Sequence, residues 1–359
     1  MELQEAKQAV MEATKKLVAS HLVARTWGNI SCRVEPDQFL ITPSGKSYDQ
    51  LTEDQLVLVS QNDLSYTGPV KPSSEKGIHA AIYRSKPHVN CVIHTHQEMA
   101  SLISLLGQDL FITDDWNELL GNTIHTAQYG LPGTKALQRH ISKVLLQGTS
   151  SAVLMANHGT LCFGSSPQVA FSVAEELEHI CQNQVFTRSS LLQSLQGTSK
   201  TKFLAKKIDN QTIHYADDLP PWLQTLCKQL LTSKTDSRYL CMHTSQEVLE
   251  VAETFTTLKA YLDDFAQIAG PSLQVMKQNP PLSKALHLAK HRDALLLQGG
   301  GALCMGINEA EAHSVATLVQ KNSKAALLSL AAPRVKALPY LDAHLMRYVY
   351  KKKYAKLAQ

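Results

Sequence analysis

Apolar residues recur with helical spacing from the N-terminus to about residue 24, and two segments of alternating polarity follow, Gly28 to Val34 and Gln38 to Thr42. Apolar residues three or four apart share one face of a helix, whereas alternation puts every second side chain on one face of a strand. The pattern predicts a helix followed by two half-buried strands.

Helices and apolar strands continue to alternate further along the chain. A second helix is expected between about 72 and 86, because Pro72-Ser73-Ser74-Glu75 offers an N-cap and an early acid. Apolar strands leading to His94 and covering 152–156 come next, and a long helix is expected from about 167 to 188. This mixture of strands and helices predicts an α/β fold.

The composition turns polar between Ser194 and Asp218, where Gly, Ser, Thr and Lys are followed by Asp-Asp-Leu-Pro-Pro. Such stretches commonly separate domains. We therefore expect a first domain at 1–195, a linker at 196–218 and a smaller second domain at 219–359.

The second domain repeats pieces of the first. Residues 94–98 (His-Thr-His-Gln-Glu) are matched by 243–247 (His-Thr-Ser-Gln-Glu), and the apolar run at 152–164 is matched by 294–306. In this alignment two histidines of the first domain are replaced, so we expect a truncated, degenerate copy that holds no metal. The replacing residues are Ser245 for His96 and Gly300 for His158.

The composition is that of an ordinary globular protein. The 359 residues are 44% hydrophobic, enough for a large core, and the net charge of +4 is too small to indicate a nucleic-acid partner. The N-terminus carries acids, no apolar run reaches membrane-spanning length, and the seven cysteines form no C-x-x-C pair. We expect reduced cysteines and a cytoplasmic location.

Three histidines have the chemistry of a zinc site. His94 and His96 stand two apart at the end of an apolar strand and therefore point to one face, and His158 ends another apolar run. Gly159 permits a tight turn there. Three imidazole ligands leave the fourth position of a tetrahedral zinc open, which is the arrangement of a catalytic metal.

Three polar segments upstream suit an anion such as phosphate: Gly28-Asn29, Ser44-Gly45-Lys46 and Ser73-Ser74. Glycines let backbone N–H groups approach an oxyanion, hydroxyls donate to it, and a helix start adds partial positive charge.

Together with the histidines, these segments resemble the class II aldolase/adducin family, which includes fuculose-1-phosphate aldolase and ribulose-5-phosphate 4-epimerase. The resemblance covers about residues 5 to 190 and implies a central, mainly antiparallel sheet flanked by helices. It also implies a divalent metal, usually zinc, and a homo-oligomer with active sites at subunit interfaces. The matching motifs, in order, are Thr26-Trp27-Gly28-Asn29-Ile30-Ser31, Ile41-Thr42-Pro43-Ser44-Gly45, Lys71-Pro72-Ser73-Ser74-Glu75, His94-Thr95-His96 and Asn157-His158-Gly159.

Carried over position by position, the resemblance makes the three histidines metal ligands and makes Glu75 the carboxylate that contacts the resting metal and serves as base. His79, one turn along, is expected to support a ligand or to pack. The positions that match the family's phosphate site are Asn29, Ser44, Gly45, Ser73 and Ser74.

The chain departs from the family at one place. Fuculose-phosphate aldolases carry a Tyr, donated by a neighbouring subunit, about 20 residues after the first metal His, where this chain has Asp114-Asp115-Trp116. Glu118 close by is the remaining candidate for the proton donor.

The sequence thus predicts a zinc-dependent aldolase that cleaves a ketose 1-phosphate to dihydroxyacetone phosphate and an aldehyde. A ketose-phosphate 4-epimerase or dehydratase of the same family stays open, as does a non-catalytic, adducin-like scaffold. The sequence leaves the identity of the sugar open.

Overall fold

The computed structural model describes residues 1–20, 28–46, 48–112 and 117–353. These residues form two compact units, unit 1 (Met1–Val185) and unit 2 (Phe186–Lys352). The two units divide within one long helix, α6 (Pro167–Arg188).

Unit 1 is built on a sheet of eight strands in the order β3-β2-β1-β4-β8-β7-β6-β5. Only β6 and β7 pair in parallel, and all other neighbouring strands in this sheet are antiparallel. The expected α/β fold with a mainly antiparallel sheet is therefore confirmed. The strands are β1 (Gly28–Glu35), β2 (Gln38–Ile41), β3 (Val57–Ser60), β4 (Cys91–Thr95), β5 (Leu110–Phe111), β6 (Thr123–Ala127), β7 (Ala152–Met155) and β8 (Gly159–Gly164).

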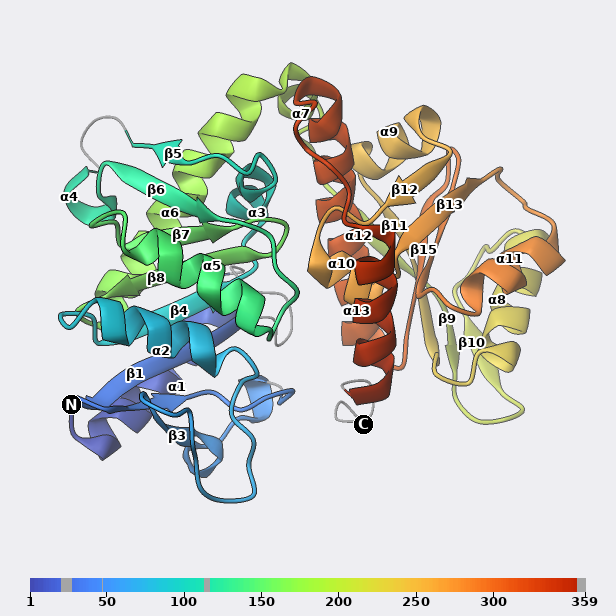
Figure 1. Ribbon diagram of the computed structural model, residues 1–359. Coiled ribbons are helices and arrows are strands. Elements are labelled where there is room, and N and C mark those ends of the chain that lie inside the picture. The colour runs from blue at the N-terminus through green and yellow to red at the C-terminus, as the bar shows by residue number, and fades with distance from the viewer. Residues whose placement is uncertain (21–27, 47, 113–116, 354–359) are drawn as a thin grey trace. The chain divides into compact units, whose positions relative to one another are not determined.

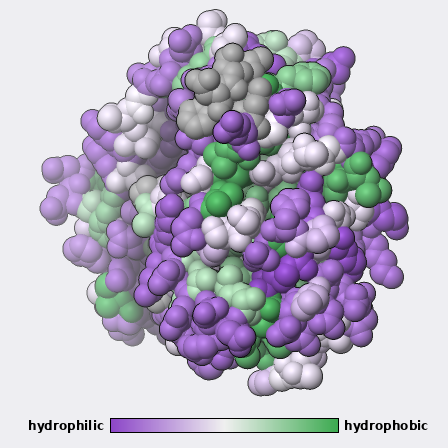
Figure 2. All heavy atoms as spheres, turned by 90° about the vertical axis from the view of Figure 1, so that its left-hand side faces the viewer, coloured by the Kyte–Doolittle hydropathy of each residue, from purple (hydrophilic) through white to green (hydrophobic). Residues whose placement is uncertain are grey.

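Helices cover both faces of this sheet (Figure 1). On one face α2 and α5 bury apolar side chains against β2, β4, β7 and β8, and on the other lie α1, α3 and α6. The outer surface of unit 1 in Figure 2 is mostly hydrophilic, with apolar residues in small groups. The helices named here are α1 (Leu3–Ala19), α2 (Lys76–Ser85), α3 (Glu98–Ser104), α4 (Asn117–Leu120) between β5 and β6, and α5 (Lys135–Leu145), and two short 3-10 turns cover Tyr48–Gln50 and Glu53–Gln55.

The second helix begins later than the sequence predicts. Glu75 is its N-cap, and helical residues start at Lys76. Ser73 lies in the segment before the helix. It donates its N–H to the Thr42 carbonyl, and its Oγ accepts the N–H of Glu75. Hydroxyl bonds of this kind compete with helix formation.

Unit 2 contains a sheet of seven strands in the order β10-β9-β11-β15-β14-β13-β12, again with a single parallel pair, β13 and β14. Helices α8 and α11 pack on one face, and α9, α10 and α12 lie on the other. No helix in the described part of the chain is long and apolar enough to cross a membrane. The elements are α7 (Ser190–Ser194), β9 (Lys200–Lys207), β10 (Ile213–Tyr215), α8 (Pro221–Ser233), β11 (Tyr239–Thr244), α9 (Gln246–Thr254), β12 (Thr257–Lys259), α10 (Asp263–Ile268), β13 (Ser272–Met276), α11 (Leu282–Ala289), β14 (Ala294–Leu297), β15 (Gly301–Gly306), α12 (Glu309–Ala331) and α13 (Tyr340–Lys353).

The linker expected at 196–218 is folded in the structure. It forms β9 and β10, the last two strands on one side of the unit 2 sheet. Their side chains are mostly exposed or half-buried, and within β9 and β10 only Leu204 and Ala205 are buried. A strand pair near a sheet edge carries few core residues, which explains why its composition resembles that of a linker.

The strand ladders also shift the sequence echo by one residue. In unit 1 His94 pairs with Leu161 of β8. The β7–β8 and β14–β15 hairpins match at Ala152↔Cys162 and Ala294↔Cys304, which makes Leu303 the counterpart of Leu161. Leu303 pairs with Met242, so Met242 is the counterpart of His94. His243, which the sequence repeat aligned with His94, is the next residue along β11. A shift of one residue turns a side chain to the opposite face, so His243 lies on the other side of its sheet.

Candidate metal centre

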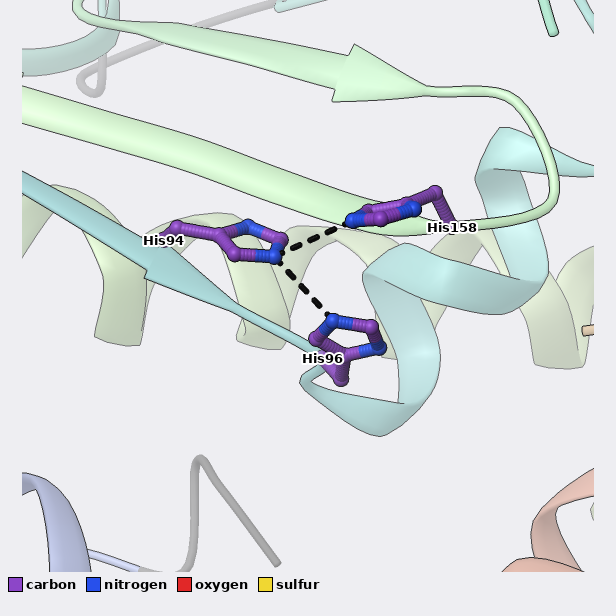
Figure 3. A group of neighbouring side chains, drawn as sticks. All are labelled: His94, His96 and His158. Atoms are coloured by element: carbon purple, nitrogen blue, oxygen red, sulfur yellow. Dashed lines mark hydrogen bonds between the residues drawn. The ribbon is translucent and has the colours of Figure 1, made fainter. Parts of the chain in front are cut away.

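The ends of two neighbouring strands bring the three histidines together. His94 is the fourth residue of β4, His96 follows that strand, and His158 lies in the turn between β7 and β8 (Figure 3). The Nε2 atom of His94 lies 3.1 Å from Nε2 of His96 and 3.1 Å from Nε2 of His158. The predicted triad thus converges on one point, from residues far apart in the sequence.

A tight turn aims His158 at the other rings. Asn157 has a left-handed backbone (φ 63°), and the N–H of His158 donates to the Met155 carbonyl. At Gly159 a Cβ atom would lie 2.3 Å from the carbonyl oxygen of Thr95, so only glycine lets β8 approach β4 this closely. The turn residues therefore set the distance between the ligand-bearing strands.

The backbone fixes the tautomer of His94. Its Nδ1 lies 2.8 Å from the carbonyl oxygen of Thr160, an acceptor, so Nδ1 carries the proton. Burial lowers the pKa of His94 to about 3, which keeps the ring neutral. The Nε2 atom of His94 consequently presents a lone pair to the centre of the cluster, as a metal ligand must.

Glu75 closes the cluster from the start of α2. Its Oε2 lies 3.3 Å from Nε2 of His94, and its Oε1 lies 3.1 Å from Nε2 of His158. Burial by itself would raise the pKa of Glu75, but the imidazoles of His94, His158 and His96 outweigh it and hold that pKa well below the usual value. The carboxylate is therefore ionised.

This donor set fits a divalent cation. One lone pair on His94 cannot accept protons from two neighbouring rings and also face a carboxylate at 3.3 Å unless positive charge lies between them. Nitrogen ligands at 2.0–2.1 Å from a tetrahedral zinc lie about 3.3 Å apart, close to the observed spacing. Among the described residues, His94, His96 and His158 form a group that could hold a metal ion. One ligand nitrogen from each ring lies within 4.8 Å of the other two.

The predicted phosphate-binding residues are assembled beside the histidines to different degrees. Asn29 of β1 pairs with His94 of β4, is 4% exposed, and donates from Nδ2 to Oε2 of Glu75 at 2.8 Å. A bridge between Pro43 and Pro72 and the bond from the Ser44 N–H to the Lys71 carbonyl join the turn after β2 to the segment before α2. In this register Ser44 lies opposite Lys71 and Ser73 lies opposite Thr42, so the two predicted segments lie on adjoining stretches of chain. Gly45 has a left-handed backbone (φ 71°), and Ser74 is exposed.

Other predicted residues are not brought to the cluster. Glu118 lies exposed on α4, between β5 and β6 at the edge of the sheet, and three strands (β8, β7 and β6) separate β5 from β4 in the strand order. Residues 26–27 of the first motif and Asp114-Asp115-Trp116 lie outside the described residues.

Ser31 and Tyr83 are two site-associated residues that sequence reasoning missed. Ser31 Oγ bonds both His79 Nδ1 and the Tyr83 hydroxyl, each at 2.7 Å. His79 Nε2 in turn lies 2.5 Å from Oδ1 of Asn29. The spacing of two along β1 and of four along α2 is the signal that places these side chains on facing surfaces.

The first half of the chain is similar to known proteins. Residues 8–185 match the sequence model of the family described as Class II Aldolase and Adducin N-terminal domain. The chain is 31% identical over 210 residues to a 5-deoxy-D-ribulose 1-phosphate aldolase of Bacillus thuringiensis, covering 58% of this chain and 98% of that protein. It is 30% identical over 183 residues to an L-fuculose phosphate aldolase of Escherichia coli O6:H1, covering 51% and 83%. A solved L-fuculose 1-phosphate aldolase aligns with 51% of this chain and 86% of its own, at 29% identity and a TM-score of 0.48.

Proposed function

Because the chain belongs to the class II aldolase and adducin family, as a metal-dependent aldehyde-lyase acting on sugar phosphates, we propose that it cleaves a ketose 1-phosphate to dihydroxyacetone phosphate and an aldehyde. Zinc is the proposed metal, since three imidazoles and one carboxylate suit its ligand preference. Short-chain 5-deoxyketose and 6-deoxyketose 1-phosphates are the proposed substrates, after the names of the two relatives.

The convergence of three Nε2 atoms and the Glu75 carboxylate within 3.1–3.3 Å is the observation that carries the proposal. A scaffold protein has no need for a histidine cluster in which His94 is neutral and fixed in one tautomer, facing a partly buried carboxylate. Such perturbed groups gather where chemistry is done.

The chain's residues divide the work of a retro-aldol cleavage. A bound divalent cation supplies Lewis-acid stabilisation of the negative charge that develops on the sugar oxygens. Glu75 accepts the proton of the substrate hydroxyl at a carboxylate oxygen and later returns a proton to carbon. Asn29 and the Ser44-Gly45 and Ser73-Ser74 segments hold the phosphate, which orients the reacting bond.

A second copy of the chain completes the proposed site. Glu118 is exposed on α4, and Phe111 of the preceding strand is 71% exposed, a large apolar area for a surface in water. We propose that this edge of unit 1 contacts a neighbouring subunit and that Glu118 is the alternative to Glu75 as donor of the proton that returns to carbon in that subunit's site, in which case Glu75 releases the hydroxyl proton to water. The buried, free cysteines suit the proposed cytoplasmic location.

Product detection tests the proposal. The purified full chain is incubated with 5-deoxyribulose, fuculose and other ketose 1-phosphates, and dihydroxyacetone phosphate is measured with a coupled reductase. We expect cleavage that a chelator abolishes and that zinc restores. A product with unchanged carbon number indicates an epimerase or a dehydratase instead, and no metal-dependent product from any substrate contradicts the proposal.

A further inference from the structure

Behind the metal centre, side chains of β1 and α2 alternate along one continuous hydrogen-bond chain. Asn29 and Ser31 are two apart on β1 and share a face of the sheet. Glu75, His79 and Tyr83 are four apart on α2 and share a face of the helix. The contacts run from Glu75 to Asn29 (2.8 Å), to His79 (2.5 Å), to Ser31 (2.7 Å) and to Tyr83 (2.7 Å).

The placement of the Asn29 amide gives this chain a single direction. Its Nδ2 donates to Oε2 of Glu75, and its Oδ1, which faces His79, must accept. His79 therefore donates Nε2–H to Asn29, and its Nδ1 accepts the hydroxyl proton of Ser31. The Ser31 oxygen then accepts from the Tyr83 hydroxyl, so every donor points toward the metal centre.

Burial keeps the chain in this state. His79 and Ser31 are fully buried, and Tyr83 is 1% exposed. Burial lowers the pKa of His79 to about 4, and the nearby Glu75 charge does not offset it, so the ring is neutral at pH 7 and has one tautomer to adopt. At the far end Arg33 lies over the Tyr83 ring and donates to its carbonyl oxygen.

We propose that His79 and Ser31 are positioning residues, which hold the Asn29 amide with its NH2 group toward Glu75 and thereby fix the carboxylate against the histidine cluster. Without the Nε2–H of His79, the Asn29 oxygen would be buried without a donor, and nothing would hold the amide with its NH2 group toward Glu75. The catalytic consequence rests on the proposed function, but the hydrogen-bond direction does not.

Nitrogen NMR of the full chain labelled at histidine tests the direction by itself. We expect the His79 ring to be neutral, with its proton on Nε2, from about pH 5.5 to 8.5, with or without zinc. A proton on Nδ1 or a charged ring at pH 7 overturns the proposal. This measurement needs no substrate, so it still tests the hydrogen-bond direction if the proposed function is wrong.

Two substitutions of His79 test the positioning. His79→Gln keeps an N–H donor at the distance of Nε2, whereas His79→Leu has similar bulk and no donor. We expect the Leu variant to bind zinc about tenfold more weakly and to lose a similar factor in kcat/KM, and the Gln variant to recover most of both. Equal losses in the two variants, or no loss in either, contradict the proposal.

A matched serine pair separates positioning from general destabilisation. Ser31→Ala and Ser104→Ala each remove one fully buried hydroxyl from unit 1, and the Ser104 hydroxyl donates to the Ser101 carbonyl within its own helix. We expect both to lower the melting temperature and only Ser31→Ala to weaken zinc binding. Equal zinc affinity in the two variants, measured on folded protein, overturns the role of Ser31 even if the Leu variant at position 79 fails to fold.

Discussion

The two units share an order of elements and differ in chemistry. From β4 to α6, unit 1 runs strand, helix, strand, helix, strand, helix, hairpin, long helix, and unit 2 repeats this from β11 to α12. Each sheet has its single parallel pair at the same place, β6–β7 in one and β13–β14 in the other. We propose that unit 2 is a truncated copy of unit 1 without counterparts of α1 and β3.

The positions that carry the metal centre in unit 1 are occupied differently in unit 2. By the strand ladders, Met242 stands where His94 does, and Gly300 stands where His158 does. The N-cap of α8 is Pro220, whereas that of α2 is Glu75. The same backbone therefore supports either a polar site or an apolar strand end, and a few side chains decide between them.

Substitution at the two matched strand positions should separate the units most strongly. His94→Ala removes a ligand, and we expect zinc binding to be lost and cleavage to fall at least about 10³-fold, since metal stabilisation of charge amounts to several kcal/mol. Met242→Ala should leave the zinc content and activity of folded protein unchanged. Zinc content by mass spectrometry and steady-state rates check both. If the His94→Ala variant retained zinc, His94 would not be a metal ligand.

The helix caps give the next largest contrast. Glu75→Gln keeps the shape of the side chain and removes its charge, and we expect kcat to fall about 10²–10⁴-fold, the range for a lost general base. Glu35→Gln, at the exposed end of β1, is the control and should leave kcat unchanged. An active Glu75→Gln variant would reassign the base.

The glycine at the start of the hairpin's second strand should be required in both units. A Cβ at Gly159 would lie 2.3 Å from the Thr95 oxygen, and one at Gly301 would lie 2.4 Å from the His243 oxygen. We expect Gly159→Ala and Gly301→Ala each to destabilise the protein by about 1–3 kcal/mol in urea unfolding. Only the first should also weaken zinc binding, because it displaces His158. Loss of zinc from both variants would contradict the claim that unit 1 alone determines zinc binding.

Acid should weaken unit 2 through Asp293. Burial would raise the pKa of this carboxyl, but the cations of Arg347, Lys234 and Lys351 outweigh it and hold the pKa well below the usual value. The ion pairs therefore contribute stability above the unfolded pKa of about 4, and this stability is lost as the pH falls below it. Between pH 6 and pH 3 we expect Asp293→Asn to lose about 1–2 kcal/mol less than the wild type and the exposed Asp217→Asn to lose as much. Equal pH slopes in all three proteins would contradict this.

Strand alternation and residue spacing were enough to predict an α/β fold for unit 1 and the meeting of three histidines, whereas the mainly antiparallel sheet was expected from the family resemblance. The start of α2 was misplaced because a hydroxyl bond local to Ser73 competes with helix formation, and β9 was taken for a linker because it buries only two residues. The position of His243 depended on strand register, which is set by pairing across the sheet and is invisible in an aligned sequence. Glu118 lies away from the histidines of its own chain, so its predicted role depends on a neighbouring subunit.

The bond from His94 Nδ1 to the carbonyl of Thr160 has a consequence for how this protein tolerates change. Because the acceptor is main chain, no replacement at position 160 that preserves the β4–β8 pairing deletes it. Selection can therefore vary the surrounding side chains, and with them the preferred sugar, while the ligand keeps the protonation that metal binding needs. The β4–β8 pairing therefore preserves the tautomer of His94 while neighbouring side chains change in evolution.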